Sequence, residues 1–308
     1  MMSEYKHKNI TWVDLENPTQ EEALQIVKRF EIDPLIANEL ILPTLRPRVE
    51  YYKDYIYLIL NFPTTHQNGQ EKIASDKIQE IDFIIGKKFI ITTRYNTVDA
   101  LLEFAKAFEV KSILDKGNGA EHAGHIFFHM TQYLYKSMMH RLAHIRDLLH
   151  DIENKIFSGH EKTMVVEISK LNRRILNYKE SISLHQEILE SFEVACKKFF
   201  GSDFDYYSHA TLGEYHKVKT ELTSTKEYLE ELRETNDSLL STKQNEIMKI
   251  LTVTNFIFLP LALIAGIFNM NTKYMPIVGS RFDFYIIICL MLLLSIGMYI
   301  YFKRKKWL

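Results

Sequence analysis

Two uncharged stretches near the C-terminus decide the fold: residues 250–268 read ILTVTNFIFLPLALIAGIF, and residues 284–302 read FYIIICLMLLLSIGMYIYF. Each is about as long as a helix must be to cross the hydrocarbon core of a bilayer. A short polar segment, 269–283, separates them, and the basic run Lys303-Arg304-Lys305-Lys306 follows. Buried core helices of a soluble protein are the alternative, but their length and flanking cations favour two transmembrane helices.

The basic residues at the C-terminus also predict an orientation. Lys and Arg next to a span stay on the cytoplasmic side of a membrane. With two spans, both chain termini are then cytoplasmic, and we expect a multi-pass protein of the cell's inner, cytoplasmic membrane. Residues 1–9 are polar with no apolar stretch behind them, so we expect no signal peptide.

Composition excludes several classes of function. The 308 residues hold 38 Lys and Arg against 39 Asp and Glu, a formal net charge of -1, and a dedicated nucleic-acid binder would need a cationic surplus. The two cysteines, Cys196 and Cys289, match no disulfide or zinc framework. The sequence contains no phosphate-binding Gly-rich loop, nucleophile elbow or CxxC motif, so we expect no enzyme activity.

The first 120 residues predict a compact cytoplasmic domain of mixed α and β structure. Apolar, β-branched runs bounded by turn residues predict strands, and capped amphipathic runs predict helices. The expected strands are 12–15, 48–52, 55–62, 78–85 and 88–93, and the expected helices are 18–30, 33–42 and 97–108. Two of the strand pairs form hairpins, so we expect a largely antiparallel sheet.

Residues 121–249 are different, because no proline occurs between Pro63 and Pro260. Breaks near Gly159 and Gly201 leave three long helices, 121–157, 161–199 and 211 onward. The third has no stop signal before the membrane, so we expect it to continue into the first span as one stalk helix. Its apolar stripe has coiled-coil spacing and comprises Tyr215, Val218, Leu222, Thr225, Leu229, Leu232, Asn236 and Leu239.

A second stripe lies further along the same helix and has the same three- and four-residue steps. It consists of Ser241, Asn245, Met248, Thr252, Asn255, Leu259, Ala262, Gly266 and Asn269. Within the span this face holds the polar and small residues of a helix otherwise built of Ile, Leu, Phe and Val. Such residues either mediate close helix packing in lipid or face water in a pore formed by identical helices. The continuation of the stripe below the membrane favours the pore.

The C-terminal third of the chain holds a set of distinctive motifs. Residues 243–263 read KQNEIMKILTVTNFIFLPLAL, Asn269-Met270-Asn271 and Met275-Pro276 follow, and Trp307-Leu308 come after the basic run. With these motifs, this part of the chain resembles the CorA family of divalent-metal channels. Upstream, residues 33–42 and 46–50 resemble the family's cytoplasmic domain. The resemblance therefore covers most of the chain.

The resemblance implies a funnel-shaped homopentamer with an α+β cytoplasmic domain, long stalk helices and two C-terminal transmembrane helices. The first span, 250–268, would line the pore, 269–283 would form the outer loop, 284–302 the second span and 303–308 a basic tail. The selectivity filter would comprise Asn269, Met270 and Asn271, which could hold hydrated Mg²⁺ through its waters. The pore line would comprise Asn245, Met248, Leu251, Thr252, Asn255, Leu259, Ala262 and Gly266, with Met248 and Leu251 as a hydrophobic gate.

The outer loop departs from the family's pattern. Asn269 stands where the family signature has glycine, and Thr272-Lys273 and Ile277 stand where many members carry acidic residues. The loop, which includes Lys273, Tyr274, Met275 and Pro276, has a net charge of about +1 per subunit. Magnesium is the expected ion, with no tightly bound cofactor, and zinc, cobalt or nickel is the second choice. The loop is nearer in character to ZntB-type zinc transporters of the same superfamily, so a ZntB-like zinc transporter is the alternative function.

In the family, intracellular magnesium bound by acidic residues between subunits holds the pore shut. Glu39 lies where one such residue is expected, and its candidate partners are Asp203, Asp205 and Glu214. A role for Glu39 as an ordinary solvated residue is an equal alternative.

Histidines at helical spacing offer another possible metal site. One set is His122, His125 and His129, and the other is His140, His144, Asp147 and Asp151. Such runs also arise by chance in a His-rich helical region. From a different class, a membrane-tethered sensor would explain two spans without transport, but it would not require a polar stripe within the first span.

Overall fold

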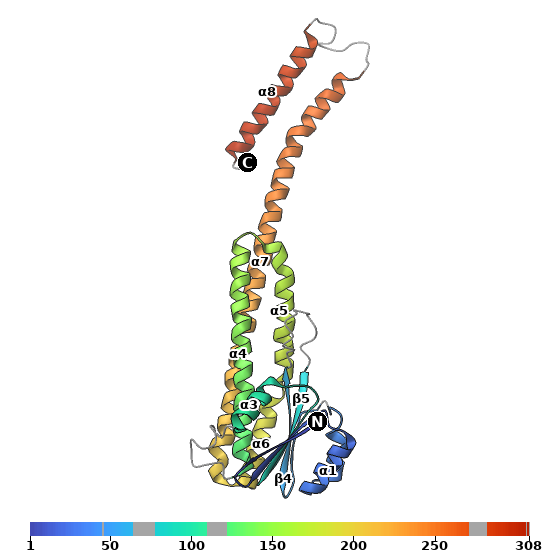
Figure 1. Ribbon diagram of the computed structural model, residues 1–308. Coiled ribbons are helices and arrows are strands. Elements are labelled where there is room, and N and C mark those ends of the chain that lie inside the picture. Colours follow the sequence, from blue (N-terminus) through green and yellow to red (C-terminus); the bar gives the residue numbers. More distant parts are fainter. Residues whose placement is uncertain (45, 64–77, 110–121, 271–281, 306, 308) are drawn as a thin grey trace. The chain divides into compact units, whose positions relative to one another are not determined.

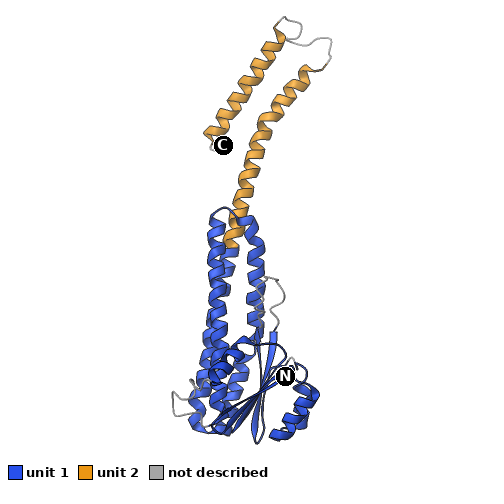
Figure 2. Ribbon diagram, in the orientation of Figure 1, with its two compact units in different colours: residues 1–233 blue, residues 234–308 orange. Residues whose placement is uncertain are grey.

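The computed structural model describes residues 1–44, 46–63, 78–109, 122–270, 282–305 and 307. The chain divides into two compact units, residues 1–233 and 234–308 (Figure 2). The first unit contains the sheet and most of the helices, and the second contains the two apolar segments.

A six-stranded mixed sheet forms the centre of the first unit. Its strands are β1 (Met2–His7), β2 (Ile10–Glu16), β3 (Val49–Tyr51), β4 (Tyr55–Pro63), β5 (Ile78–Gly86) and β6 (Phe89–Arg94), in the order β1-β2-β6-β5-β4-β3. Only β2 and β6 run parallel among these described pairs, so the expectation of a largely antiparallel sheet is confirmed. Gly86, the last residue of β5, leaves room for the Phe89 ring, because a Cβ there would lie 2.4 Å from it and the ring would have to move.

Strand β1 was not expected from the sequence, which is polar in this segment. It pairs with β2 from Met2 opposite Leu15 to His7 opposite Ile10. An edge strand needs only one buried face and gains its backbone hydrogen bonds from a neighbour, so it carries little apolar signal of its own.

Helices cover both faces of the sheet (Figure 1). On one face lie α1 (Gln20–Phe30) and the short α2 (Pro34–Glu39), which bury residues such as Val13, Leu15 and Ile91. On the other lie α3 (Asp99–Glu109), the first half of α4 (Ala123–Phe157) and α6 (His185–Phe200). Aromatic contacts seal this second face, including Trp12 on Phe104 and Phe83 on Phe127. Helix α2 is shorter than the expected 33–42.

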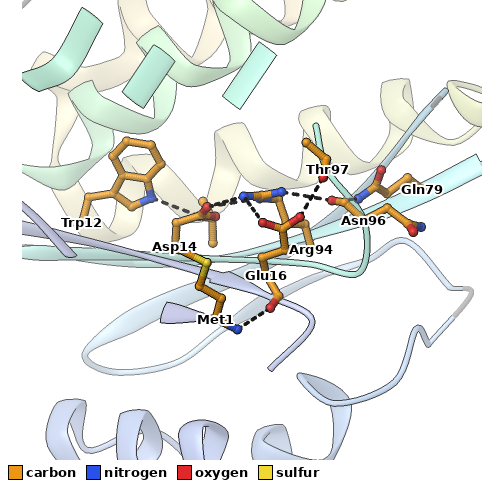
Figure 3. A network of polar contacts seen from close by, with 9 residues as sticks. Met1, Trp12, Asp14, Glu16, Gln79, Arg94, Asn96 and Thr97 are labelled. Carbon is orange, nitrogen blue, oxygen red and sulfur yellow. Dashed lines mark hydrogen bonds and ion pairs between the residues drawn. The ribbon is translucent and has the colours of Figure 1, made fainter. Parts of the chain in front are cut away.

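A charged network joins the two parallel strands (Figure 3). Arg94, only 2% exposed, donates to Asp14 Oδ2 at 3.0 Å and to Glu16 Oε2 at 3.1 Å. Thr92 donates to Asp14 Oδ1 at 2.6 Å. Burial by itself raises the pKa of Glu16. The hydrogen bond from Thr97 and the charge of Arg94 lower it by more, so the pKa of Glu16 is below its ordinary value. These bonds compensate the cost of burying charge.

The expected second long helix is broken. Instead of one helix over 161–199, α5 (Glu161–Ser181) and α6 are separated at residues 182–184. The Ser181 and Ser183 hydroxyls donate to the carbonyls of Tyr178 and Glu180, three residues back. Serine bonds of this kind compete with the helical ladder. The expected break at Gly201 is present, with a positive φ of 93° that glycine tolerates.

The last helix of the first unit is also the first helix of the second. A 3-10 turn (Ser202–Phe204) leads into α7 (Asp205–Phe268), a single 64-residue helix that begins six residues before the expected 211. Its predicted apolar stripe is buried from Tyr215 through Asn236, with Val218 and Thr225 fully inaccessible. Helix α8 (Asp283–Arg304) is the last helix.

Candidate ion pathway on the long helix

Helix α7 and helix α8 contain the two apolar segments, and both are long and apolar enough to cross a membrane. Only 6% of the apolar stretch in α7 and none of that in α8 is buried within the described chain. A core helix of a soluble protein would be covered by its own chain. The interpretation of these segments as soluble core helices is therefore wrong.

The apolar half of α7 has two different faces. Val253, Ile257, Pro260, Ile264 and Phe268 follow three- and four-residue steps and are buried or half-buried. Phe256 contacts Phe302 of α8 with ring centroids 6.2 Å apart. The opposite face, about 180° away at 100° per residue, is exposed. Among the described residues, helix α8 therefore covers one side of α7 and leaves the other uncovered.

The uncovered side is the stripe predicted to line a pore. Its apolar members are open, with Met248 53%, Leu251 52% and Leu259 69% exposed. An added Cβ at Gly266 would meet no described atom within 4 Å. The remaining exposed members are Asn245, Asn255 and Ala262, while Thr252 is half-buried and donates its hydroxyl to the Met248 carbonyl at 2.7 Å. The stripe thus lies on one face of one continuous helix and is left open by the described part of its own chain.

The predicted filter begins where α7 ends. Asn269 donates its backbone N–H to the Ala265 carbonyl at 3.1 Å, and Met270 donates to the Ile267 carbonyl at 3.1 Å. Both side chains are exposed. Asn271 and the predicted loop residues Lys273, Tyr274, Met275 and Pro276 lie outside the described residues. Of the predicted filter, the structure therefore describes only Asn269 and Met270, whose backbones are hydrogen-bonded to the last turn of α7.

The four acidic residues predicted to bind a regulatory ion each have a separate place. Glu39 ends α2 and forms an ion pair with Arg48, which also binds Glu50 at 2.8 Å. Asp205 pairs with Lys197 at 3.0 Å and Glu214 with Lys217 at 2.6 Å, while Asp203 is exposed in the 3-10 turn. One chain does not bring Glu39 together with the others. A site completed between two subunits stays a prediction.

The two histidine faces also have different surroundings. His122 caps α4 by accepting from the Gly124 N–H at 3.2 Å and stacks on Phe200 at 4.1 Å. Burial, and secondarily His125, lowers the pKa of His122 to about 4. The second face, with His140 and His144, is exposed. Within the part of the chain that the structure describes, no group of three or more His, Cys, Asp or Glu is arranged to hold a metal ion.

One buried histidine was not identified from the sequence. His185, the first residue of α6, lies between the Tyr135 hydroxyl, 2.8 Å from Nδ1, and the Asn61 carbonyl, 2.8 Å from Nε2. Complete burial lowers its pKa to about 4, so the neutral ring donates from Nε2 and accepts at Nδ1. It thereby joins α4, α6 and β4. Its partners are 50 and 124 residues away, so no local pattern indicates them.

Comparison with known proteins agrees with this arrangement over nearly the whole chain. The family described as CorA-like Mg2+ transporter protein matches residues 7–304. The Cobalt/magnesium transport protein CorA of Thermotoga maritima is 24% identical over 308 residues, which span 97% of this chain and 83% of that protein.

Two solved structures share the fold. The complete CorA magnesium transporter from Methanocaldococcus jannaschii superposes with a TM-score of 0.82 at 20% identity, over 99% of this chain and 93% of that one. The ZntB cytoplasmic domain from Vibrio parahaemolyticus gives a TM-score of 0.54 at 12% identity, over 77% of this chain and 90% of that domain. The architecture expected from the sequence, a soluble α/β domain, a long helix and two C-terminal apolar helices, is confirmed.

Proposed function

Because the chain belongs to the CorA-like Mg2+ transporter family, we propose that it carries hydrated Mg²⁺ into the cell through a pore lined by five copies of α7. Membership in this family makes the chain a divalent-cation transporter and not an enzyme. The observation that carries the pentameric pore is the uncovered face of α7. It bears Asn255 and Gly266 within the apolar segment, both exposed in the described chain, although Asn255 borders Met291 of α8 along one edge.

The physical case for a water-lined face starts from Asn255. An amide in hydrocarbon without a hydrogen-bond partner is costly, whereas facing water removes that cost. Five such faces around an axis give a channel with an amide ring at Asn255. Met248 and Leu251 below it form an apolar constriction, which can close the channel by excluding water. Both chain termini and the basic tail lie on the cytoplasmic side in this arrangement.

Selectivity in this proposal comes from the ring of Asn271 at the outer mouth, with Met270 and Asn269 beside it. Magnesium gives up its water reluctantly, so amide oxygens that bind its hydration shell select the ion without stripping it. Regulation follows from Glu39 of one subunit and Asp203, Asp205 or Glu214 of the next. Mg²⁺ bound there would hold the subunits together and the pore shut.

The decisive experiment measures divalent-cation flux into liposomes that contain the purified full-length protein. We expect Mg²⁺ uptake down its gradient, with or without a pH gradient. Asn271→Ala should reduce it by at least about fivefold, since even one lost hydrogen bond of ~1 kcal/mol to the hydrated ion has that effect. Asn154→Ala, exposed near the end of α4, is the matched control and should leave flux unchanged. Absence of flux for Mg²⁺, Co²⁺, Ni²⁺ and Zn²⁺ alike would refute the proposal.

Zinc transport is the second candidate, and the absence of an acidic outer ring favours it. Lys273 and Arg281 against Asp283 leave the loop cationic, which repels Mg²⁺ and Zn²⁺ alike, so the case for zinc is that the acidic residues of many family members are missing here. The double variant Asn269→Gly and Lys273→Glu restores the family pattern. If the loop sets the ion, this variant shifts the Mg²⁺-to-Zn²⁺ flux ratio toward Mg²⁺. An unchanged ratio would mean that neither residue contributes to selectivity.

A further inference from the structure

A cavity of about 480 Å³ lies in the first unit between the α5–α6 break and α7. Its floor is apolar and belongs to the protein core: Ile175, Ile182, Tyr215 and Leu222 line it, and each is at most 5% exposed. This volume falls within the range of small-molecule binding sites. The cavity therefore offers a ligand both space and an apolar surface.

The rim of the cavity carries three lysines. Lys179 from α5 and Lys219 and Lys226 from α7 line it, together with the carboxylate of Glu187. Lys226 is neutralised by Glu230 at 3.0 Å, while Lys219 donates to the Gln186 amide, which in turn donates to Glu190 at 3.0 Å. Neither Lys179 nor Lys219 forms an ion pair with a carboxylate among the described residues, so an anionic ligand at this rim can contact both ammonium groups.

The start of α6 adds backbone N–H donors beside these lysines. Gln186 and Glu187 line the cavity from the first turn of this 16-residue helix, Ser183 lines it just before the helix begins, and the helix has no side-chain cap from the described residues. The positive end of a helix dipole and its first backbone N–H groups favour a bound anion. The lysines, the helix end and the apolar floor come from three different elements and meet at one cavity.

We propose that this cavity binds a small soluble organic phosphate whose planar, weakly polar body rests on the apolar floor and whose phosphate contacts Lys219 and the start of α6. A nucleoside monophosphate has this chemistry. A lipid does not fit the location, because Lys226 precedes the first span by 24 residues of continuous helix, about 36 Å at 1.5 Å per residue. An uncharged apolar ligand would make no ionic contact with the lysines that line the cavity.

Binding is tested with adenosine monophosphate and the full-length protein in lipid nanodiscs, by equilibrium dialysis in metal-free buffer with EDTA. We expect saturable binding of one molecule per chain, weakened by added salt because the contact is partly ionic. Inorganic phosphate and adenosine should each bind at least about tenfold more weakly, because each lacks half of the contacts. Equal affinity for either fragment, or no saturable binding because a second copy covers the cavity, overturns the proposal.

Three variants test whether the ligand binds in this cavity or to positive charge elsewhere on the surface. Lys219→Gln should weaken binding about tenfold by removing one charged contact, and Ser183→Phe should block the cavity. Lys217→Gln is the matched control, two residues away on the same helix, where Lys217 pairs with Glu214 outside the cavity. It should change affinity less than about twofold. Equal loss in both lysine variants, or full binding in Ser183→Phe, contradicts the assignment.

A consequence for transport rests on the proposed function. The ligand would contact both α7 and the start of α6, and α7 continues to the pore. Adenosine monophosphate should therefore change Mg²⁺ flux in wild-type liposomes and have no effect in Lys219→Gln. Binding is measured without an ion gradient, so failure of transport and failure of the site are separate results. Flux that responds equally in both proteins would overturn the link to this cavity.

Discussion

The two halves of α7 carry stripes of the same spacing and differ in what covers them. In the lower half, Tyr215, Leu222 and Leu229 are at most 5% exposed because helices of the same chain enclose them. In the upper half, Met248, Leu251 and Leu259 are more than half exposed. A stripe predicts that a face will be covered but does not identify the cover. The lower stripe finds it within the chain, and the upper stripe requires lipid, water or other subunits.

The largest expected effect separates the two stripes by stability. Leu229→Ala should lower the free energy of unfolding by about 2–5 kcal/mol, because it leaves a cavity in a packed core. Leu259→Ala removes the same atoms from an exposed site and should cost less than ~0.5 kcal/mol. Chemical denaturation of the detergent-solubilised protein measures both. Similar losses in the two variants would mean that the upper stripe is also packed within one chain.

The stability of the first unit, residues 1–233, should depend on pH through its buried histidines. Burial holds the pKa of His185 at about 4 against an ordinary 6.5, so between these values the unfolded chain binds a proton that the folded chain excludes. Stability should therefore fall as pH falls through this window, by about 1.4 kcal/mol per pH unit and ~3 kcal/mol in total.

The variant His185→Gln isolates this term, because His122, whose pKa is also about 4, adds a slope of its own. Thermal unfolding of both proteins from pH 7 to 5 gives the difference. The wild type should lose stability more steeply than His185→Gln. Parallel curves would show that His185 takes up its proton in the folded state.

A smaller effect tests whether the upper stripe faces water. Asn255→Leu removes the amide in mid-span and should reduce Mg²⁺ flux by about fivefold, the equivalent of one hydrogen bond of ~1 kcal/mol. Ile257→Leu, on the half-buried side of the same helix, is the control and should retain flux. If Asn255→Leu conducts normally, this face packs against helices or lipid and does not line the pathway.

The smallest effect concerns the polar residue within the lower stripe. Asn236 is 1% exposed, and its Oδ1 has no hydrogen-bond partner among the described residues. Asn236→Leu should raise the free energy of unfolding by about 1 kcal/mol, since an unsatisfied buried polar group is removed. Thermal unfolding provides the measurement. A loss of stability would assign Asn236 a partner and a role in fixing the register of the helices.

Local patterns predicted much of this architecture because their causes are local. The two spans follow from uninterrupted apolar length, the stripes of α7 from three- and four-residue steps, and the break at 201 from a glycine, which tolerates the φ of 93° found there. The structure differs from the sequence prediction where a residue far away in the chain determines the local structure. Strand β1 exists through its pairing with β2, and α6 begins at His185, whose ring bonds the distant Asn61 carbonyl and Tyr135 hydroxyl.

The sequence by itself determined two apolar helices, one continuous stalk and the face of that stalk that carries amides, because each depends on residues within a few turns of one another. Only the tertiary structure decided which face α8 covers, that Glu39 pairs with Arg48, and that three lysines meet an apolar floor beside the start of α6. These facts join residues far apart in the chain. Periodicity carries no information about such pairs, because they form only when the packed elements bring them together.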